Sequence, residues 1–426
     1  MSPRIDDPRA GTVRAVPHPP LDKLSDPLSV EPPETPCPSY LETSQARHWM
    51  FSREELNQLR SETYAQATAA LREFVKENEP GTTLHLLSKE DELSIIRFYL
   101  LRIGRLVKAF GLPSLVEATA MTLMKRFYLR NSCMQFHPKL IMLTSIYLAS
   151  KAENYPLPLS VFCTQVNKNS APRDPGQTPS AARGDVTEKI IEDLEFGMVQ
   201  SLNFELAVHG AHRALYGLIL DLQTIEPSLT RDEWLSIASA IQSNLHLSRF
   251  SDAEFLYTPS QIALASCWIS STGRDSLSGK ALAEKWLSSK EELSTQIHKK
   301  NVQNHEHWNA KHKALHPEPQ PSADESQTKI LDHKASKPSF EAEKVKSILE
   351  KASQEVLSVA QHQNGDSEPL RPYVDTEHVK QIDLHLRSNL LIFEKMQKTV
   401  NRKRSASDGP ENPKRARIDT QASDSE

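Results

Sequence analysis

The stretch from Pro138 to Glu153, PKLIMLTSIYLASKAE, constrains the fold more than any other part of this sequence. Between Leu140 and Ala149 almost every side chain is apolar, and the polar exceptions are small. A helix that is apolar all round must be buried on all sides, and this one is shorter than the roughly 20 apolar residues that span a bilayer. We therefore expect it to be the central helix of a helical bundle.

The same pattern returns at Pro259–Ser271, PSQIALASCWISS. When the two prolines are aligned, identical residues stand at Pro138/Pro259, Ile141/Ile262, Leu143/Leu264, Ser145/Ser266 and Ser150/Ser271. Self-similarity at so long an offset indicates a duplicated domain. The second copy has Thr272 where the first has Lys151, so only the first copy ends in this charge.

The composition fits two domains with extensions, because the chain has 426 residues. The hydrophobic content of 38% and the mean hydropathy of −0.52 are low, which predicts disorder in part of the chain. A net charge of −4 argues against a general nucleic-acid-binding body. The widely spaced cysteines fit reduced thiols in a cytosolic or nuclear protein, and the N-terminus lacks the apolar run of a signal peptide or membrane segment.

Capping residues, prolines and apolar spacing predict the helices, and no strand signal is present. Ser52 with Glu55 forms a capping box for a helix that reaches about Val75, and Ser88 with Asp91 begins a helix that ends at Gly111. Further helices are expected at 113–131, 138–151, 159–166 and 185–203 in the first half, and at 211–223, 231–249, 259–271 and 279–288 in the second.

These signals divide the chain into a series of segments. Residues 1–44 hold ten prolines before Leu41 and are expected to form a disordered arm. The segments that follow are an N-terminal helix at 45–80, a first bundle at 81–206, a second bundle at 207–290, a polar, largely disordered insert at 291–375 with one candidate helix at 341–360, a C-terminal helix at 376–400 and a disordered basic tail at 401–426. The helix at 376–400 is either the displaced last helix of the second domain or an appended packing helix.

The sequence contains no motif for catalysis, a cofactor or a metal. GRDSLSGKA (273–281) has five residues between its glycines and Ala281 after the lysine, whereas a phosphate-binding loop needs four residues there and Ser or Thr after the lysine. No GxSxG, HExxH or kinase catalytic loop occurs. The histidines of 298–316 lack a completing cysteine or carboxylate pattern, so a solvated linker is expected there.

Four segments resemble one protein family closely: RHWMFSREEL, KRFYLRNSCMQFHPKLIMLTSIYLASKAE, MVQSLNFELAVHGAHR and FLYTPSQIALA. They are similar to the cyclins, and most closely to the cyclin H family, over residues 45–290. The resemblance implies an all-α fold of tandem five-helix cyclin boxes. It also implies a non-catalytic subunit, without cofactor or metal, that activates the CDK-activating kinase of general transcription factor IIH in the nucleus.

The resemblance implies partners and contact residues as well. The partners would be a cyclin-dependent kinase, an assembly-factor subunit and the transcription factor IIH core, with no direct contact to nucleic acid or membrane. Lys151 and Glu195 would make the central polar contacts with the kinase, and Phe196, Val199 and Phe204 would lie near its regulatory helix. From the residues alone, Lys151 also fits a solvated lysine at a helix C-terminus, Glu195 a solvated acidic face, and the three apolar residues a core.

Two departures from the family pattern bear on function. Ala152 stands where many cyclins have an aromatic residue, and the helix at 88–110 lacks the MRAIL-type patch by which cell-cycle cyclins dock substrates. Substrate docking of that kind is therefore not expected.

Two further features lie outside the two bundles. Trp49 and Phe51 precede the first helix, where they either staple it to the bundle or contact the kinase. Two basic clusters in the tail have the spacing of a bipartite nuclear import signal: Arg402, Lys403, Arg404, Lys414, Arg415 and Arg417.

Two other functions remain open from the sequence. One is a transcriptional cyclin that serves an elongation or Mediator kinase. The other is a cyclin-fold initiation factor bound to DNA, like general transcription factor IIB, although that family carries an N-terminal zinc ribbon and this N-terminus has only Cys37.

Overall fold

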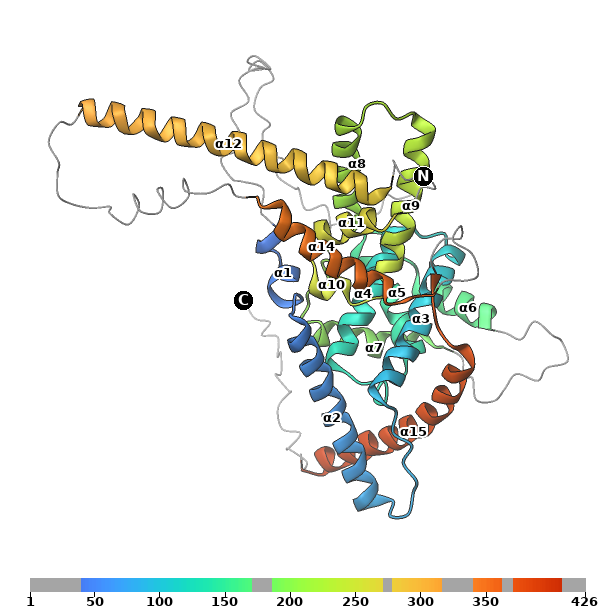
Figure 1. Cartoon of the computed structure of the whole chain (residues 1–426). Coiled ribbons are helices and arrows are strands. Elements are labelled where there is room, and N and C mark those ends of the chain that lie inside the picture. The colour runs from blue at the N-terminus through green and yellow to red at the C-terminus, as the bar shows by residue number, and fades with distance from the viewer. Residues whose placement is uncertain (1–39, 171–185, 271–277, 316–339, 362–370, 408–426) are drawn as a thin grey trace, which may run out of the picture. The chain divides into compact units, whose positions relative to one another are not determined.

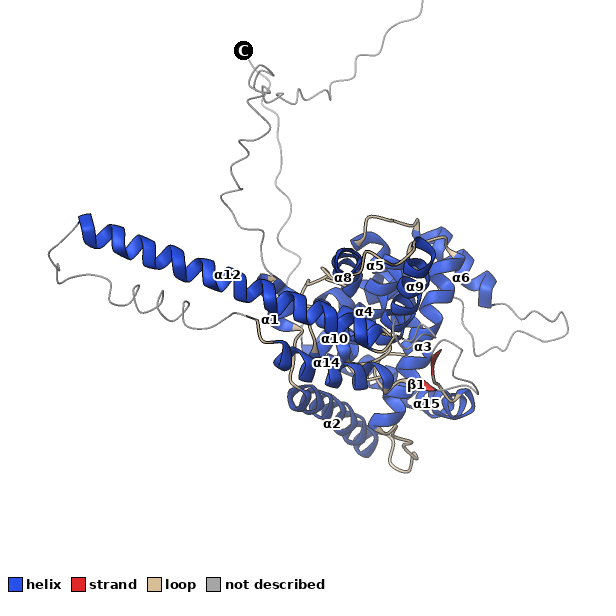
Figure 2. Cartoon of the chain, turned by 45° about the horizontal axis from the view of Figure 1, so that its top comes forward, coloured by secondary structure: helices blue, strands red, loops and turns tan. Residues whose placement is uncertain are grey.

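The computed structural model describes residues 40–170, 186–270, 278–315, 340–361 and 371–407 (Figure 1). Over these ranges helices make up nearly all of the regular structure, which confirms the predicted all-α fold (Figure 2). From Ser44 onward the described residues belong to one compact unit, and the short 3-10 helix η1 (Tyr40–Glu42) belongs to the preceding one. The arm predicted at 1–44 falls almost wholly outside the described residues, as does most of the tail.

The first bundle consists of the five helices that were predicted between residues 88 and 203. They are α3 (Lys89–Ala109), α4 (Ser114–Arg130), α5 (Pro138–Ala152), α6 (Leu159–Ser170) and α7 (Glu188–Ser201). Helix α5 packs against α3, α4 and α7 and buries Ile141, Leu143 and Ile146, so the prediction of a central helix is confirmed. Each of these side chains contributes roughly 1.5–3 kcal/mol by its burial.

Helix α4 is buried along nearly its whole length, from Val116 to Leu129, although it carries charged residues. It packs against α2, α3, α5 and α7. Its buried charges have partners in distant segments: the Nζ of Lys125, for example, lies 2.9 Å from the carboxylate of Glu254 and donates to the carbonyl of Ser251 at 3.0 Å. Charged residues of α4 therefore connect the first bundle to segments that follow it.

Local capping explains where several helices begin. Helix α1 (Ser44–His48) is followed by α2 (Arg53–Asn78), and the predicted capping box of Ser52 and Glu55 is present. The capping box of Ser88 and Asp91 begins α3 as expected. Helix α7 begins differently, because Thr187 is its N-cap and accepts a hydrogen bond from the amide of Ile190, whereas the start predicted at residue 185 lies outside the described residues.

The second bundle is built around α11 (Pro259–Trp268), the second copy of the repeated pattern. It packs against α8 (Ala211–Ile225), α9 (Arg231–Ser248), α10 (Ala253–Leu256), α12 (Gly279–Leu315) and α14 (Ala342–Leu357). The repeat found in the sequence thus corresponds to two central helices, α5 and α11, each enclosed by its own set of neighbours.

Helix α12 is much longer than predicted, because it continues beyond residue 288 to Leu315. Figures 1 and 2 show its C-terminal half running past the helices around it. The polar composition from residue 291 onward indicated disorder, but the segment contains mainly good helix formers and no proline before Pro317. The expectation that this part of the insert lacks structure was wrong.

Helix α14 also changes the expected organisation. It lies within the predicted insert, yet it packs against α9, α11 and α12 and buries Leu349, Ala352 and Val356. Apolar contacts therefore extend the second bundle well beyond residue 290. Two short strands that the sequence did not predict, β1 (Ala360–Gln361) and β2 (Arg371–Pro372), pair antiparallel after this helix.

Helix α15 (Thr376–Ser407) packs against α2 and α3, which decides between the two alternatives left by the sequence. It buries Val379, Ile382 and Leu386 against these helices. It is an appended packing helix, and it does not close the second bundle. Among the helices that the structure describes, none combines the length and the apolar character needed to cross a membrane.

Candidate functional site

Lys151 and Glu195 meet at the surface of the first bundle, although they are far apart in the sequence. Lys151 stands in the last turn of α5 and Glu195 on α7, and the ammonium forms an ion pair with the carboxylate. The Lys151 Nζ also lies 4.6 Å from the centre of the Tyr147 ring. The side chains are 39% and 20% exposed. The ion pair therefore forms within this chain, without a second protein. The Lys151 ammonium keeps unused hydrogen-bonding capacity, since it has three donors.

The turn after α5 fixes the orientation of this surface. Asn154 adopts a left-handed conformation with φ 62°, which asparagine tolerates better than most residues. The next amide, of Tyr155, donates to the carbonyl of Ser150 at 2.7 Å. This turn ends the helix directly behind Lys151 and holds its backbone in place.

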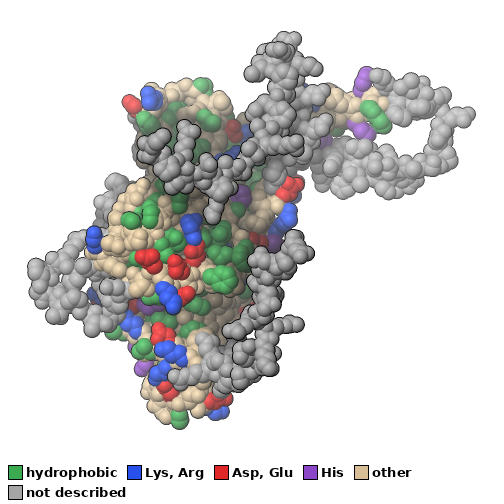
Figure 3. Space-filling model, turned by 180° about the vertical axis from the view of Figure 1, so that it is seen from behind, with side chains coloured by type: hydrophobic (Ala, Val, Ile, Leu, Met, Phe, Trp, Pro, Cys, Tyr) green, Lys and Arg blue, Asp and Glu red, His purple; other side chains and the backbone are tan. Residues whose placement is uncertain are grey.

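Two phenylalanines in the segment that carries Glu195 are exposed. Phe196 is 64% exposed and Phe204 is 68% exposed, whereas Met198 and Leu202 of the same segment are fully buried. Val199 is partly buried against the core. The alternative that all three apolar residues belong to the core is therefore excluded for Phe196 and Phe204. Figure 3 shows that hydrophobic side chains also reach the surface among acidic and basic ones on one face of the molecule.

Phe204 is exposed from a strained backbone. Its φ is 61° and that of Asn203 is 53°, so both residues are left-handed. This conformation costs a residue with a Cβ atom roughly 1–2 kcal/mol, and a bulky residue there is a genuine outlier. Two hydrogen bonds hold the turn: the amide of Phe204 donates to the carbonyl of Val199, and that of Asn203 to Gln200, both at 3.0 Å. Strain of this kind clusters at functional sites.

The N-terminal segment supports the same turn through Glu205. Trp49 is 1% exposed, and its Nε1 donates to the Glu205 carboxylate at 2.7 Å. His48 contacts the other carboxylate oxygen. The guanidinium groups of Arg126 and Arg130 each lie 4.9 Å from the Trp49 ring. Trp49 thus packs in the core and fixes the residue that follows Phe204.

Phe51 makes a different contact. It is half-buried, its amide donates to the carbonyl of Phe255 at 2.8 Å, and the two rings lie edge to face with centres 6.3 Å apart. Phe51 therefore joins the N-terminal segment to the second bundle.

The supporting residues Gln45, Arg126 and Glu205 were not found by sequence reasoning. Gln45 accepts hydrogen bonds from Arg126 at 2.9 Å and from the amide of His209 at 2.8 Å, and it donates to the His209 carbonyl at 3.2 Å. No local pattern marks these residues, because each contact joins segments that are distant in the sequence. The signal that was present is the charge of Arg126 beside Lys125 in a mostly apolar stretch of α4.

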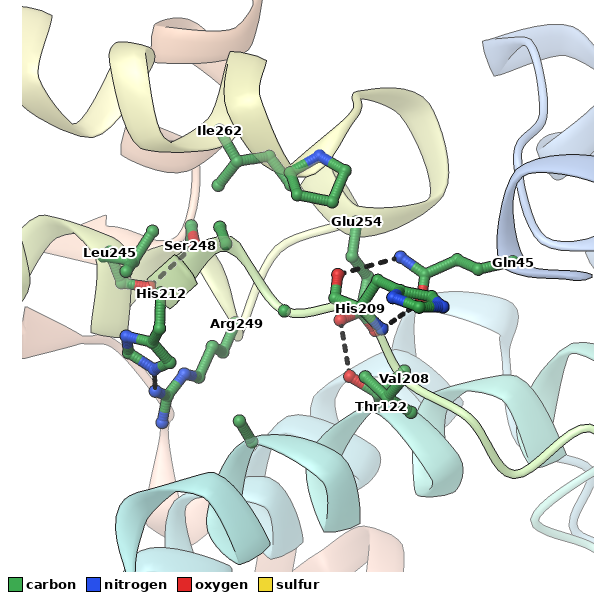
Figure 4. A pocket seen from close by; sticks show the side chains of 14 residues that line it. Gln45, Thr122, Val208, His209, His212, Leu245, Ser248, Arg249, Glu254 and Ile262 are labelled. Carbon is green, nitrogen blue, oxygen red and sulfur yellow. Dashed lines mark hydrogen bonds between the residues drawn. The ribbon is translucent and has the colours of Figure 1, made fainter. Parts of the chain in front are cut away.

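A small cavity lies beside this network (Figure 4). It measures about 50 Å³, and its lining includes Gln45, Thr122, His209, Arg249 and Glu254. Ligand sites for organic molecules usually measure roughly 300–1,000 Å³, so this cavity fits solvent and not a substrate. In the part of the chain that the structure describes, no three His, Cys, Asp or Glu residues are grouped as a metal site.

Only part of the predicted nuclear import signal lies within the residues that the structure describes. Arg402, Lys403 and Arg404 fall in the last turns of α15, and 414–417 lies outside the described residues. This signal stays a prediction.

Comparison with known proteins gives a consistent family. The cyclin N-terminal domain matches residues 97–207, and the cyclin C-terminal domain matches residues 210–354. Cyclin-H of Xenopus laevis is 31% identical over 264 residues, which cover 61% of this chain and 76% of that protein. Cyclin mcs2 of Schizosaccharomyces pombe is 30% identical over 237 residues, which cover 54% of this chain and 68% of that protein.

Two solved structures have the same fold. The chain matched in the CAK complex from Chaetomium thermophilum bound to ATP-gamma-S has a TM-score of 0.55 and 22% identity, and the match covers 88% of this chain and 98% of that one. The chain matched in the yeast TFIIK (Kin28/Ccl1/Tfb3) complex has a TM-score of 0.50 and 21% identity, and the match covers 74% of this chain and 100% of that one. At this identity the likeness shows the fold.

Proposed function

We propose that this chain, which belongs to the cyclin family, is the regulatory subunit that binds and activates a transcription-linked cyclin-dependent kinase. Its similarity to proteins named cyclin-H supports a CDK-activating kinase, which phosphorylates kinase activation loops and the C-terminal domain of RNA polymerase II. The chain itself is non-catalytic in this proposal.

The proposed mechanism follows from what a kinase needs for phosphoryl transfer. An active kinase pairs the lysine of its β3 strand with the glutamate of its αC helix. A subunit that binds only the conformation with αC held inward shifts the kinase population toward the active state. The shift equals the difference in binding free energy between the two conformations, and a change from 1:99 to 99:1 needs about 5.5 kcal/mol.

The observation that carries this proposal is the surface formed by Lys151, Glu195, Phe196 and Phe204, which we call the α5–α7 surface. It combines a preformed ion pair with two phenylalanines that are mostly exposed. Aromatic side chains are enriched at protein interfaces, and charged groups that pair with the partner add specificity and affinity. We propose that the phenylalanines pack on the αC helix, that Val199 supports them, and that Lys151 and Glu195 bond to polar groups of the kinase.

The wider assembly is also part of the proposal. The partners are the kinase, an assembly-factor subunit and the transcription factor IIH core, in the nucleus. The basic clusters at 402–404 and 414–417 support nuclear import.

The test is a reconstitution of the full chain with its candidate kinase. Phosphorylation of an activation-loop substrate and of a polymerase C-terminal-domain peptide would be measured with wild type and with Lys151→Ala/Glu195→Ala. A matched control is Lys285→Ala/Glu226→Ala, which removes another surface ion pair, between α12 and the C-cap residue of α8. We expect strong activation by wild type and control, and at least about tenfold less by the first variant, since charges lost from an interface cost about 2–5 kcal/mol.

Two results would contradict parts of this proposal. Full kinase activity without the chain, with the assembly subunit present, would refute the regulatory function. Activation that survives in Lys151→Ala/Glu195→Ala would keep the function but refute the α5–α7 surface as its central contact.

A further inference from the structure

A second surface feature, distinct from the α5–α7 surface, lies between the two bundles. It is a groove of about 530 Å³, lined by α3 and α4 of the first bundle and by α8 and α9 of the second. We call it the basic groove. Its charged and titratable side chains are Arg105, Lys108, Glu117, His212, His246 and Arg249.

The charges of the basic groove do not balance. Arg105 and Lys108 stand one helical turn apart on α3, and both are exposed. Glu117 is the one carboxylate among the lining residues, and it faces other groups: it lies 3.8 Å from His246 and 3.9 Å from Arg249. Within the described residues no ion pair involves Arg105 or Lys108. Both cations are therefore available to a ligand.

Arg249 adds a third fixed positive charge at the base of the groove. Its side chain is only 11% exposed, and it donates to the Nε2 of His212 (Figure 4). Burial, with the nearby Arg249 and His246, lowers the pKa of His212 to about 4, so this imidazole is neutral at pH 7 and acts as the acceptor. Three cations thus face one carboxylate.

The backbone at the groove also favours an anion. Helix α4 begins at Ser114, which lines the groove, and Pro113 before it provides no side-chain cap. The first amides of a helix carry partial positive charge and lack partners within the helix. Gly104 of α3 leaves room for the Glu117 side chain of α4 at the wall of the groove, because a Cβ atom on Gly104 would lie 2.7 Å from the Glu117 carboxylate.

We propose that the basic groove binds the phosphate of a phosphoserine or phosphothreonine in a peptide segment. A phosphate monoester carries close to two negative charges and three strong acceptor oxygens, which match Arg105 and Lys108 at the rim and Arg249 behind them. Arginine suits this chemistry because it binds phosphate oxygens in pairs. The cations form one cluster and not a long stripe, so a single monoester fits better than a row of phosphodiesters. The choice of a phosphopeptide rests on the proposed function, because a bound kinase produces such side chains.

The test measures binding to the full chain alone, so it does not depend on kinase activation. The probe is a fluorescein-labelled seven-residue alanine peptide with a central phosphothreonine, compared by anisotropy with the same peptide carrying threonine. We expect binding of the phosphopeptide, and at least about tenfold weaker binding by Arg105→Ala/Lys108→Ala, since each 1.4 kcal/mol lost is tenfold. The matched control is Arg72→Ala/Lys76→Ala, which removes two exposed cations from α2.

Each arm of the experiment can overturn the proposal. Equal binding of both peptides, or equal loss in both double variants, would show general charge attraction without a phosphate site. Competition by inorganic phosphate at the affinity of the phosphopeptide would show a free-anion site. Tighter binding of a single-stranded oligonucleotide would show a nucleic-acid groove. A negative result in the peptide-binding test does not affect the kinase-activation test. A negative result in the kinase-activation test does not affect the interpretation of peptide binding, which is measured on the chain alone.

Discussion

The left-handed backbone of Phe204 allows a prediction in which stability and binding respond differently to the same substitutions. Phe204 is 68% exposed, so its ring contributes little burial, while its φ of 61° imposes a cost that glycine does not have. We therefore compare Phe204→Gly with Phe204→Ala. Both variants lose the exposed ring, but only alanine keeps a Cβ atom in the left-handed region.

The expected magnitudes follow from these two terms. Losing the buried third of the ring costs roughly 0.5–1 kcal/mol in either variant. Glycine removes the left-handed penalty of about 1–2 kcal/mol but loses roughly 0.5–1 kcal/mol through the greater freedom of the unfolded chain. Phe204→Gly should therefore be more stable than Phe204→Ala by up to about 1.5 kcal/mol.

Phe196 provides the matched control. It is exposed to a similar degree at 64%, but it lies inside the regular helix α7. There glycine is less favourable than alanine by about 1 kcal/mol. The order of the two variants should therefore reverse between position 204 and position 196.

The assay is urea denaturation of the four variants, with the transition midpoints compared within each pair. A second readout is binding to the kinase, which all four variants should weaken because each removes a phenylalanine of the α5–α7 surface. If Phe204→Ala is more stable than Phe204→Gly by about as much as alanine exceeds glycine at position 196, the strain argument is refuted. If binding is unchanged at both positions, the proposed contact is refuted.

Other predictions concern the groups that hold this surface and the basic groove. Trp49→Phe keeps a ring but removes the hydrogen-bond donor to Glu205, so it should lower the free energy of unfolding by roughly 1–3 kcal/mol. It should also weaken kinase binding, although Trp49 itself is buried. If Trp49→Phe is destabilised by this amount but binds the kinase as wild type does, Trp49 acts on stability alone. His212 has a pKa lowered mainly by burial, to about 4, so the unfolded chain binds more protons and stability should fall as the pH drops from about 6.5 toward 4. Stability measured against pH should decline less over this range in His212→Asn, and an identical decline would assign the effect to other groups.

The helices were predictable because their signals are local. Ser52 with Glu55, and Ser88 with Asp91, fix helix starts through contacts within four residues, and the same capping boxes are present in the structure. The duplicated apolar pattern predicted two central helices for the same reason. The candidate helix at 341–360 corresponds to α14. Polar composition was a poor guide to α12, which helix propensity extends, and to the packing of α14, where Leu349 and Val356 are buried.

The candidate site was less predictable from physics alone. The positions of Lys151 and Glu195 followed from the family resemblance, whereas the residues by themselves favoured solvated charges. The ion pair needs α5 and α7 to be packed together, which no local pattern encodes. The hydrogen bonds from Trp49 to Glu205 and from Arg126 to Gln45 join segments more than 75 residues apart, so they depend on the completed fold.

The segment that joins the two bundles is common to both proposed surfaces. Phe204 stands at its start, and Glu205 is fixed by Trp49. His209 is held through both its amide and its carbonyl by Gln45, and His212 at its end accepts from Arg249 in the basic groove. Because buried residues of α1 and α4 fix the connection at several points, the α5–α7 surface and the basic groove are held in a defined relation. A connecting segment with so many long-range contacts acts as part of the core, and it holds the two surfaces that we propose for binding in fixed positions relative to each other.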